Sequence, residues 1–514
     1  MKKDFLLIAA VYLLACTAVL PFVKWYVDNP DSLQYVSIAH HILGGRWALA
    51  VNGYWSPLIS WMLVPFIYIF DDGIIAFKYL QMAIGVYVIA KWLSFLSLTE
   101  IEDKWKRVLG FAIIPFVISY SLNNLTPDLL FVGILFALIV AIIRWLEKQS
   151  DGQKIGQLGA LLYLTKAFAL PLFIFLFAIT YWMKDERLTK ATVKKIIYPF
   201  ILISGIWILC LSIKYGKFTI SESAKFNFTY EVAPIVGKDT QLPVLGNGLL
   251  KPANDFAVSA WEEPASQVRL TSLDPIHDLS YYGKVVKRNV LSIYYHDFRH
   301  QIGSVFLLLF VIYLIRKKKE KRIPVWVIIS LLVIVGLYFG YSLILVHERY
   351  IWICSLLFLP TTFFFVKETF PNIGLKQFVE IGLIAFLLFA IKRPMKEVIL
   401  CGDRSVNKLQ LFHTFISPME SMEVFYRKDK QLHDDIEKLK RIIPESSNFA
   451  SIRNFNPERD GYASSLLIAY ELHGKYWGQT QERDSTFKGY LVRWKEEVGE
   501  KVFDSDGGVK VYRR

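Results

Sequence analysis

Long apolar segments separated by short polar loops are the main pattern along this chain. Several of them reach or approach the length of about 20 residues that a helix needs to cross a bilayer. Examples are the segments 5–23, 74–98, 129–145, 325–346 and 378–391. Water-soluble domains rarely contain so many apolar stretches, so the pattern predicts an all-α polytopic membrane protein. Threading all the segments gives about eleven transmembrane helices.

The composition agrees with a membrane protein and changes how the charge is interpreted. Of the 514 residues, 54% are hydrophobic and 15% are aromatic. A net charge of +14 would suggest nucleic-acid binding in a soluble protein, but here Lys and Arg are concentrated in short loops, as membrane orientation requires. We therefore expect membrane lipid, and no nucleic acid, as a partner. The four cysteines lie far apart without a CxxC pair, so neither a disulfide framework nor a metal cluster is predicted.

The basic loops also predict the orientation of the chain. The loops 183–195 and 316–322 are rich in Lys and Arg and are expected in the cytoplasm, together with the N-terminus. The loops 24–73 and 214–301 then lie outside, provided that the apolar segment 56–70 rests at the membrane surface. That segment is short and contains two prolines, which favours this interpretation. The expected location is the inner (plasma) membrane.

The composition changes near residue 392. Residues 1–391 form the predicted transmembrane domain, whereas residues 392–514 have the composition of a small soluble α/β domain on the extracytoplasmic, or periplasmic, side. Within it, helices are predicted at 432–443 and 461–478, and strands at 448–454 and 502–514.

Polar residues in otherwise apolar surroundings reach the same membrane face in this arrangement. They are Asp31, Asp128, Lys166, His347, Glu348 and Arg349. The orientation was derived from loop charges alone, so the shared face is an independent indication of one site. Asp28 lies three residues before Asp31 in the first outer loop and is a further candidate.

Each of these residues also has a purely structural interpretation. Asp31 and Asp128 precede apolar helical segments and could cap them. Lys166 could extend its ammonium group to the membrane interface, although a charge in so apolar a segment is costly unless it is paired. Glu348 and Arg349 could form an interfacial ion pair. The adjacent His40 and His41 point about 100° apart on a helix, so they are expected to pack rather than to bind a metal.

Taken together, the carboxylates and cations suit chemistry on a lipid-linked phosphate. A carboxylate can activate a hydroxyl group, while a lysine and an arginine stabilise the phosphate that leaves. Arginine in particular binds phosphate through two parallel hydrogen bonds. No cofactor or metal is required by this set of residues. A divalent cation between the acids and the phosphate is compatible with it.

Five stretches carry a resemblance to a known family. They are "PDSLQYVSIAHHILGGRW", "NGYWSPLISWML", "TPDLLF", "GALLYLTKAFAL" and "HERYIW", in this order along the chain. The chain resembles the GT-C class of membrane glycosyltransferases, within the bacterial polyprenyl-phosphate-sugar transferases related to protein O-mannosyltransferases and aminoarabinose transferases. Where the aminoarabinose branch has a Lys-Pro pair, this chain has Trp55 and Ser56 before a proline. The resemblance therefore does not imply the donor sugar.

The resemblance implies a GT-C-like fold and an inverting, single-displacement transfer from a polyprenyl-phosphate-linked sugar to an acceptor hydroxyl. It assigns the catalytic base to Asp31, matches Asp128 to a second outer-loop acid, and places Lys166 and Arg349 near the donor phosphate. The residues themselves, apart from the resemblance, add Asp28 as a further catalytic candidate and His347 as a further phosphate-binding candidate. Glu348 is expected to orient Arg349, and Tyr35 and Tyr350 are expected in supporting positions.

Two other functions remain open at this stage. A transporter or flippase for a lipid-linked saccharide also needs buried charges, but it tends to hold them at mid-membrane and to contain internal repeats. A glycan polymerase or ligase would use a similar site with a diphosphate-linked donor. The acceptor is not identified by any motif, and its selection is expected in the region 215–300 and the tail.

Overall fold

The computed structural model describes most of the chain, and the description below is confined to that part. The residues concerned are 2–27, 29–149, 152–183, 190–232, 248–267, 279–299, 301–316, 322–370, 376–400, 417–452, 461–480, 487–493, 500–505 and 509–513. Asp28 lies outside them, so its candidacy has no structural account.

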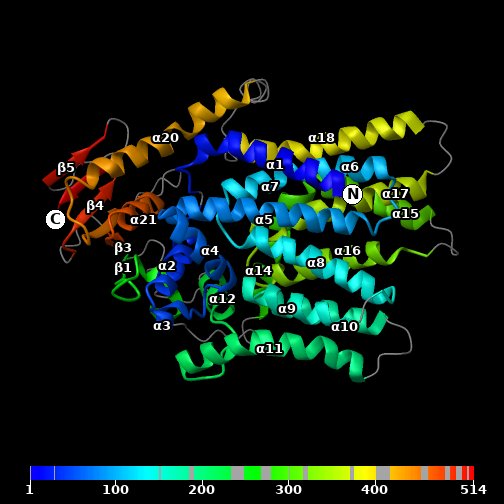
Figure 1. Cartoon of the computed structure of the whole chain (residues 1–514), viewed down its shortest axis with the longest axis horizontal. Coiled ribbons are helices and arrows are strands. Elements are labelled where there is room, and N and C mark those ends of the chain that lie inside the picture. Colours follow the sequence, from blue (N-terminus) through cyan, green and yellow to red (C-terminus); the bar gives the residue numbers. More distant parts are fainter. Residues whose placement is uncertain are drawn as a thin grey trace.

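Helices make up the larger part of the molecule and run mostly along its long axis (Figure 1). In chain order they are α1 (Lys2–Val23), α2 (Asp31–Leu43), α3 (Trp47–Ala50), α4 (Leu58–Phe70), α5 (Gly73–Leu96), α6 (Asp103–Ala112), α7 (Ile114–Leu122), α8 (Asp128–Leu146), α9 (Gln153–Thr165), α10 (Ala169–Met183), α11 (Lys190–Tyr215), α12 (Ser223–Val232), α13 (Pro264–Gln267), α14 (Leu279–Ile293), α15 (Ile302–Arg316), α16 (Val325–Ser342), α17 (Glu348–Thr369), α18 (Lys376–Leu400), α20 (Pro418–Leu439) and α21 (Gly461–Glu471). Two short helices, η2 (Ala260–Glu262) and η3 (Tyr294–Phe298), belong to the loops.

The predicted membrane architecture is confirmed in its type. By length and composition, seven helical stretches in the described residues could cross a membrane, or eight if a bent pair around η3 counts as one span. Among them are α1, α5, α8, α16 and α17, with α6 and α7 forming one span together. The other predicted crossings coincide with the shorter helices α9, α10 and α15 and with α18. The total of about eleven stays a prediction.

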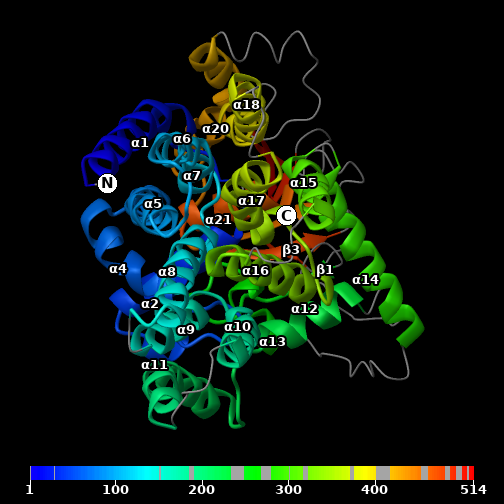
Figure 2. The same cartoon turned by 90° about the vertical axis from the view of Figure 1, so that its right-hand side faces the viewer.

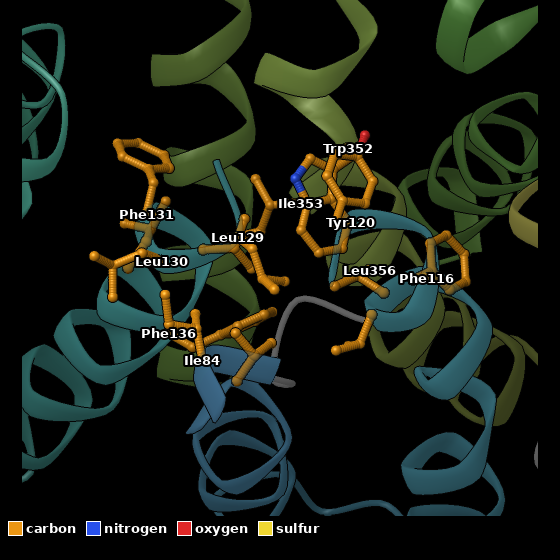
Figure 3. Packing of buried hydrophobic residues seen from close by; sticks show 14 of the residues in the cluster. Ile84, Phe116, Tyr120, Leu129, Leu130, Phe131, Phe136, Trp352, Ile353 and Leu356 are labelled. Atoms are coloured by element: carbon orange, nitrogen blue, oxygen red, sulfur yellow. The ribbon is translucent and has the colours of Figure 1, made fainter. Parts of the chain in front are cut away.

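Helices α5 and α8 pack closely against each other in the bundle, which Figure 2 shows from one end. Small residues allow this close approach, because a side chain at Gly133 would come within 2.8 Å of the Tyr87 ring. Nearer the site, residues of α7, α8 and α17 pack side by side (Figure 3). There the rings of Tyr120 and Trp352 stack with centroids 4.1 Å apart. The apolar packing thus holds the N-terminal turns of α8 and α17 beside one another.

The C-terminal region folds as an α/β unit at one end of the long axis (Figure 1). Its sheet has the strand order β1-β3-β2-β4-β6-β5. The strands are β1 (Gly248–Leu249), β2 (Asn448–Ile452), β3 (Lys475–Thr480), β4 (Tyr490–Arg493), β5 (Glu500–Asp504) and β6 (Lys510–Arg513). β2 pairs in parallel with β3 and β4, whereas the other pairs are antiparallel. The small α/β domain predicted from the sequence is therefore present.

Two details of this region differ from the prediction. The segment 461–478 is not one helix: α21 ends at Glu471, His473 takes a positive φ of 50°, and β3 starts at Lys475. A side chain at Gly474 would come within 2.5 Å of a backbone oxygen, so the chain turns there at a residue without one. In addition, β1 comes from the outer loop predicted at 214–301 and completes the sheet by pairing with β3.

Candidate functional site

Eight of the nine predicted site residues line one cavity. It has a volume of about 720 Å³. The eight are Asp31, Tyr35, Asp128, Lys166, His347, Glu348, Arg349 and Tyr350. They come from α2, the first turn of α8, the C-terminal end of α9 and the start of α17, which meet at the end of the bundle next to the C-terminal domain. The predicted convergence on one face is thus present in the structure, whereas the roles of the residues remain predictions.

Asp31 begins α2 but does not cap it. Pro30 occupies the cap position, and the Asn29 side chain accepts a hydrogen bond of 2.9 Å from the backbone N–H of Asp31. The Asp31 carboxylate therefore does not cap the helix and contacts other residues instead. Its Oδ2 accepts a hydrogen bond of 2.8 Å from Arg349 Nη2, and its Oδ1 accepts one of 3.3 Å from the indole Nε1–H of Trp261.

Asp128 is the buried acid of the site, with 2% of its surface exposed. It does not cap α8 through its side chain either. Its Oδ1 lies 2.5 Å from Lys166 Nζ, its Oδ2 accepts a hydrogen bond of 2.6 Å from the Thr126 hydroxyl, and the same oxygen lies 4.0 Å from Arg349 Nε. A carboxylate buried this deeply requires such compensation. Asp128 therefore holds both cations of the site in place.

Lys166 reaches the cavity because the helix breaks at this residue. α9 ends at Thr165, and Lys166 has an extended backbone with φ −151° and ψ 126° before α10 begins. Its ammonium group pairs with Asp128 and lies 3.8 Å from the centre of the Tyr350 ring. Pairing inside the protein, rather than extension to the membrane interface, thus compensates this charge.

Arg349 lies in the first turn of α17 and bridges the two acids. Its Nη2 contacts Asp31 and its Nε faces Asp128. Its remaining terminal nitrogen, Nη1, is buried and has no hydrogen-bond partner in the described part of the chain. Buried N–H groups are nearly always satisfied, so the unpartnered nitrogen leaves this cavity-lining guanidinium with hydrogen-bonding capacity that an anionic ligand could use.

His347 and Glu348 lie at the N-terminal end of α17. His347 faces the cavity, and enclosure by protein together with the Arg349 charge lowers its pKa from 6.5 to about 4. It would therefore meet a ligand as a neutral hydrogen-bonding group. Arg349 is oriented by Asp31 and Asp128, whereas the Glu348 carboxylate lies 3.6 Å from His296 Nδ1. The two aspartates thus occupy the orienting role predicted for Glu348.

Aromatic rings form the wall around the charged groups. Tyr35 is 6% exposed, and burial together with the nearby Asp31 charge raises its pKa well above 10.0. Tyr350 stacks on Tyr341, with ring centres 4.9 Å apart. Tyr341 also lines the cavity, and its buried hydroxyl has no partner among the described residues. Tyr35 and Tyr350 therefore both lie in the cavity wall, and their supporting role stays a prediction.

Sequence reasoning missed Trp261, Glu262 and Tyr341. Trp261 contacts Asp31 from 230 positions away, and Glu262 binds α2 from a loop without a recognisable motif. The one signal in the sequence is the tryptophan in "SAWEEP", an apolar residue within a polar segment. His41 packs as predicted and, in addition, its Nε2 lies 2.9 Å from Glu262 Oε1.

The described acidic side chains of the site pair with cationic side chains. Among the described residues there is no group of three or more His, Cys, Asp or Glu side chains that could hold a metal ion. Asp31 and Asp128 also already contact a guanidinium and an ammonium group. Lys166 and Arg349 thus occupy positions beside the two acids, and a divalent cation at this site stays a prediction.

Comparisons with known proteins place this site in a known fold. No protein-family model and no curated protein matches the sequence. The structure is similar to that of ArnT from Cupriavidus metallidurans bound to undecaprenyl phosphate, with a TM-score of 0.57, 10% sequence identity, and 98% of this chain and 97% of that chain covered. It is similar to the apo state of the same protein with a TM-score of 0.50, 10% identity and 98% of both chains covered. Over nearly its whole length, the chain therefore has the fold of ArnT, the GT-C-like fold that its sequence motifs predicted.

Proposed function

We propose that this protein is a glycosyltransferase that moves a sugar from a polyprenyl-phosphate donor to an acceptor hydroxyl. One observation carries the proposal. Lys166 and Arg349 meet in one cavity, each is held by a buried or half-buried carboxylate, and Arg349 keeps one nitrogen unpartnered. This is the arrangement expected for binding a phosphate monoester or diester. The ArnT structure with undecaprenyl phosphate supports a polyprenyl phosphate as the ligand.

The donor phosphate is assigned to the part of the cavity beside Arg349 and Lys166, whose side chains are 18% and 17% exposed. Asp128 orients Lys166, and Asp31 orients Arg349. The site therefore needs no reorganisation when charge develops on the leaving phosphate. The Lys166 ammonium also rests on the Tyr350 ring, which limits its freedom before the ligand arrives. A polyprenyl tail is apolar and would remain in contact with the membrane-facing part of the bundle.

Asp31 is assigned the role of general base. Its side chain is 17% exposed, whereas that of Asp128 is 3% exposed and contacts Lys166 and Thr126. Asp31 can therefore meet an acceptor hydroxyl, whereas Asp128 serves the cations. In the proposed step the acceptor oxygen attacks the anomeric carbon, its proton passes to Asp31, and the bond to the phosphate oxygen breaks with its electron pair going to the phosphate. A single displacement of this kind inverts the anomeric configuration.

The alternatives are less well supported by the geometry. The charged groups lie at the ends of α8, α9 and α17 rather than at their centres, which is unlike the mid-membrane site of a transporter. A polymerase or ligase with a diphosphate-linked donor would use the same cations. The two functions differ only in the donor, so an experiment that supplies each donor in turn distinguishes them.

The test uses purified protein in lipid nanodiscs. Polyprenyl-monophosphate and polyprenyl-diphosphate donors carrying a labelled sugar are each supplied together with an envelope extract as the source of acceptor. We expect label in the acceptor fraction, and release of polyprenyl phosphate, with a monophosphate donor only. Transfer from the diphosphate donor alone would favour the polymerase or ligase, and movement of donor across a vesicle bilayer without cleavage would favour the flippase. The Asp31→Asn variant is the matched control.

A further inference from the structure

The outer segment 248–263 links the C-terminal domain to the proposed base. On one side β1 pairs with β3, and Leu250 N–H donates a hydrogen bond of 2.7 Å to the Trp477 carbonyl. Tyr476 N–H donates another of 2.7 Å to the Val258 carbonyl. On the other side, Trp261 and Glu262 contact α2 and the cavity. The segment is therefore held by the sheet edge at one end and by the site at the other.

Glu262 anchors the segment on α2. It is 1% exposed, and its carboxylate accepts hydrogen bonds from the Ser37 hydroxyl and from Asn254 Nδ2, the latter at 2.9 Å. His41 Nε2 lies 2.9 Å from the same carboxylate. The Glu262 carbonyl accepts a further hydrogen bond of 2.7 Å from the Asn52 side chain. A buried carboxylate with this many donors has little freedom to move, so the position of its neighbour Trp261 is closely determined.

Trp261 transmits this anchoring to Asp31. Its ring is 8% exposed and packs edge-on against Trp55 and Phe226. Its carbonyl accepts a hydrogen bond of 3.1 Å from Trp55 Nε1. With backbone and ring both held, the indole N–H is aimed at Asp31 Oδ1 at 3.3 Å, while Arg349 holds Oδ2. The carboxylate is thus fixed at both oxygens by donors that lie 230 and 318 positions away in the sequence.

We infer that Trp261 is a positioning residue that orients the Asp31 carboxylate for proton abstraction, and that Glu262 and the edge of the C-terminal sheet hold Trp261 in place. The inference rests on the proposed function and deepens it. On this inference the C-terminal domain contributes to catalysis indirectly. None of its residues takes part in the reaction, but β3 supports the segment that orients the base. Orientation of a base by a fixed neighbour is a general requirement of such sites.

The experiment removes the indole N–H with little change in volume. Trp261→Phe should lower kcat about tenfold, the scale of one lost hydrogen bond to a charged group, and should change the KM for the polyprenyl-phosphate donor less than twofold. Trp92→Phe is the matched control, because Trp92 is also buried and donates its indole N–H, at 3.0 Å to the Leu109 carbonyl, away from the cavity. It should lower thermal stability without lowering kcat.

A second pair of variants tests the anchor. Glu262→Gln should reduce kcat in the same way as Trp261→Phe, whereas Glu263→Gln should not, since Glu263 contacts Lys214 and Tyr215 rather than α2. If Trp261→Phe does not fold, 3-benzothienylalanine at position 261 keeps the ring shape and removes only the N–H. It should show the same loss of kcat.

The outcomes separate this inference from the proposed function. If the wild-type protein does not use a polyprenyl-phosphate donor, the proposed function fails. If the wild-type protein is active and Trp261→Phe or its isostere keeps the kcat of the Trp92→Phe control, the positioning role is overturned while the proposed function stands. A rise in donor KM without a fall in kcat would overturn it as well, because it would place Trp261 in donor binding.

Discussion

The ion pair between Asp128 and Lys166 leads to a prediction that can be measured as a free energy. Asp128→Asn preserves shape but removes the negative charge that lies 2.5 Å from Lys166 Nζ. Removing one partner of a buried ion pair costs about 3–5 kcal/mol, because the other charge is left uncompensated. Lys166 keeps 17% of its side chain exposed to the cavity, so we expect the low end of that range, about 3 kcal/mol.

A double-mutant cycle isolates the interaction. Lys166→Met should cost about as much as Asp128→Asn, since Asp128 then retains only Thr126 and a guanidinium 4.0 Å away. The double variant contains neither charge, and we expect its loss to be smaller than the sum of the single losses by about 2 kcal/mol. The magnitude follows from the proximity and the burial of the pair.

The assay is unfolding in mixed micelles, titrated with SDS and followed by tryptophan fluorescence. Each variant is compared with the wild-type protein for its free energy of unfolding. The reasoning would be refuted if the loss in the double variant equalled the sum of the two single losses within about 0.5 kcal/mol. Such additivity is typical of residues that do not interact. The cations of the site would then not depend on Asp128 for their position.

Three further predictions concern the donor, pH and topology. Arg349→Lys keeps a charge but loses the bidentate geometry, so the donor KM should rise about tenfold or more in a turnover assay, and an unchanged KM would remove Arg349 from phosphate binding. Because the pKa of His347 is lowered from 6.5 to about 4, the native protein binds fewer protons than the unfolded chain in this interval, and stability falls as the pH drops through it. His347→Gln should lessen that fall in thermal-shift measurements between these pH values, and an unaltered profile would contradict the shift. A cysteine at position 319 should react with a membrane-impermeant maleimide only from the cytoplasm and one at position 430 only from outside; the reverse pattern would invert the predicted orientation.

Much of the fold was predictable because it follows from local patterns. Helices α1, α5 and α8 are long and apolar. In a membrane, a helix is the structure in which such a segment can satisfy its own backbone hydrogen bonds. Lys166 was identified for the same reason, since a charge in an apolar stretch requires a partner or a polar cavity. The loop charges predicted that the polar residues share one face, and the structure gathers eight of the nine predicted site residues in one cavity.

The contacts within the site were less predictable because they join residues that lie far apart in the sequence. Lys166 and Asp128 are 38 positions apart, and Arg349 and Asp31 are 318 positions apart. No periodicity indicates which acid meets which cation. The helix predicted at 461–478 failed at its end for a local reason: Gly474 allows the close turn into β3, and that glycine was not treated as a helix stop.

Single-turnover transfer by the Asp31→Asn variant tests the central claim most directly. Protein in nanodiscs is mixed in excess with a polyprenyl-phosphate donor carrying a labelled sugar, and the label reaching the acceptor fraction is followed over time. The account predicts that the variant binds the donor as tightly as the wild-type protein but transfers its sugar at least about 100-fold more slowly, the usual effect of losing a general base. Transfer at a near-normal rate would contradict the assignment of Asp31 as the base and, with it, the proposed mechanism.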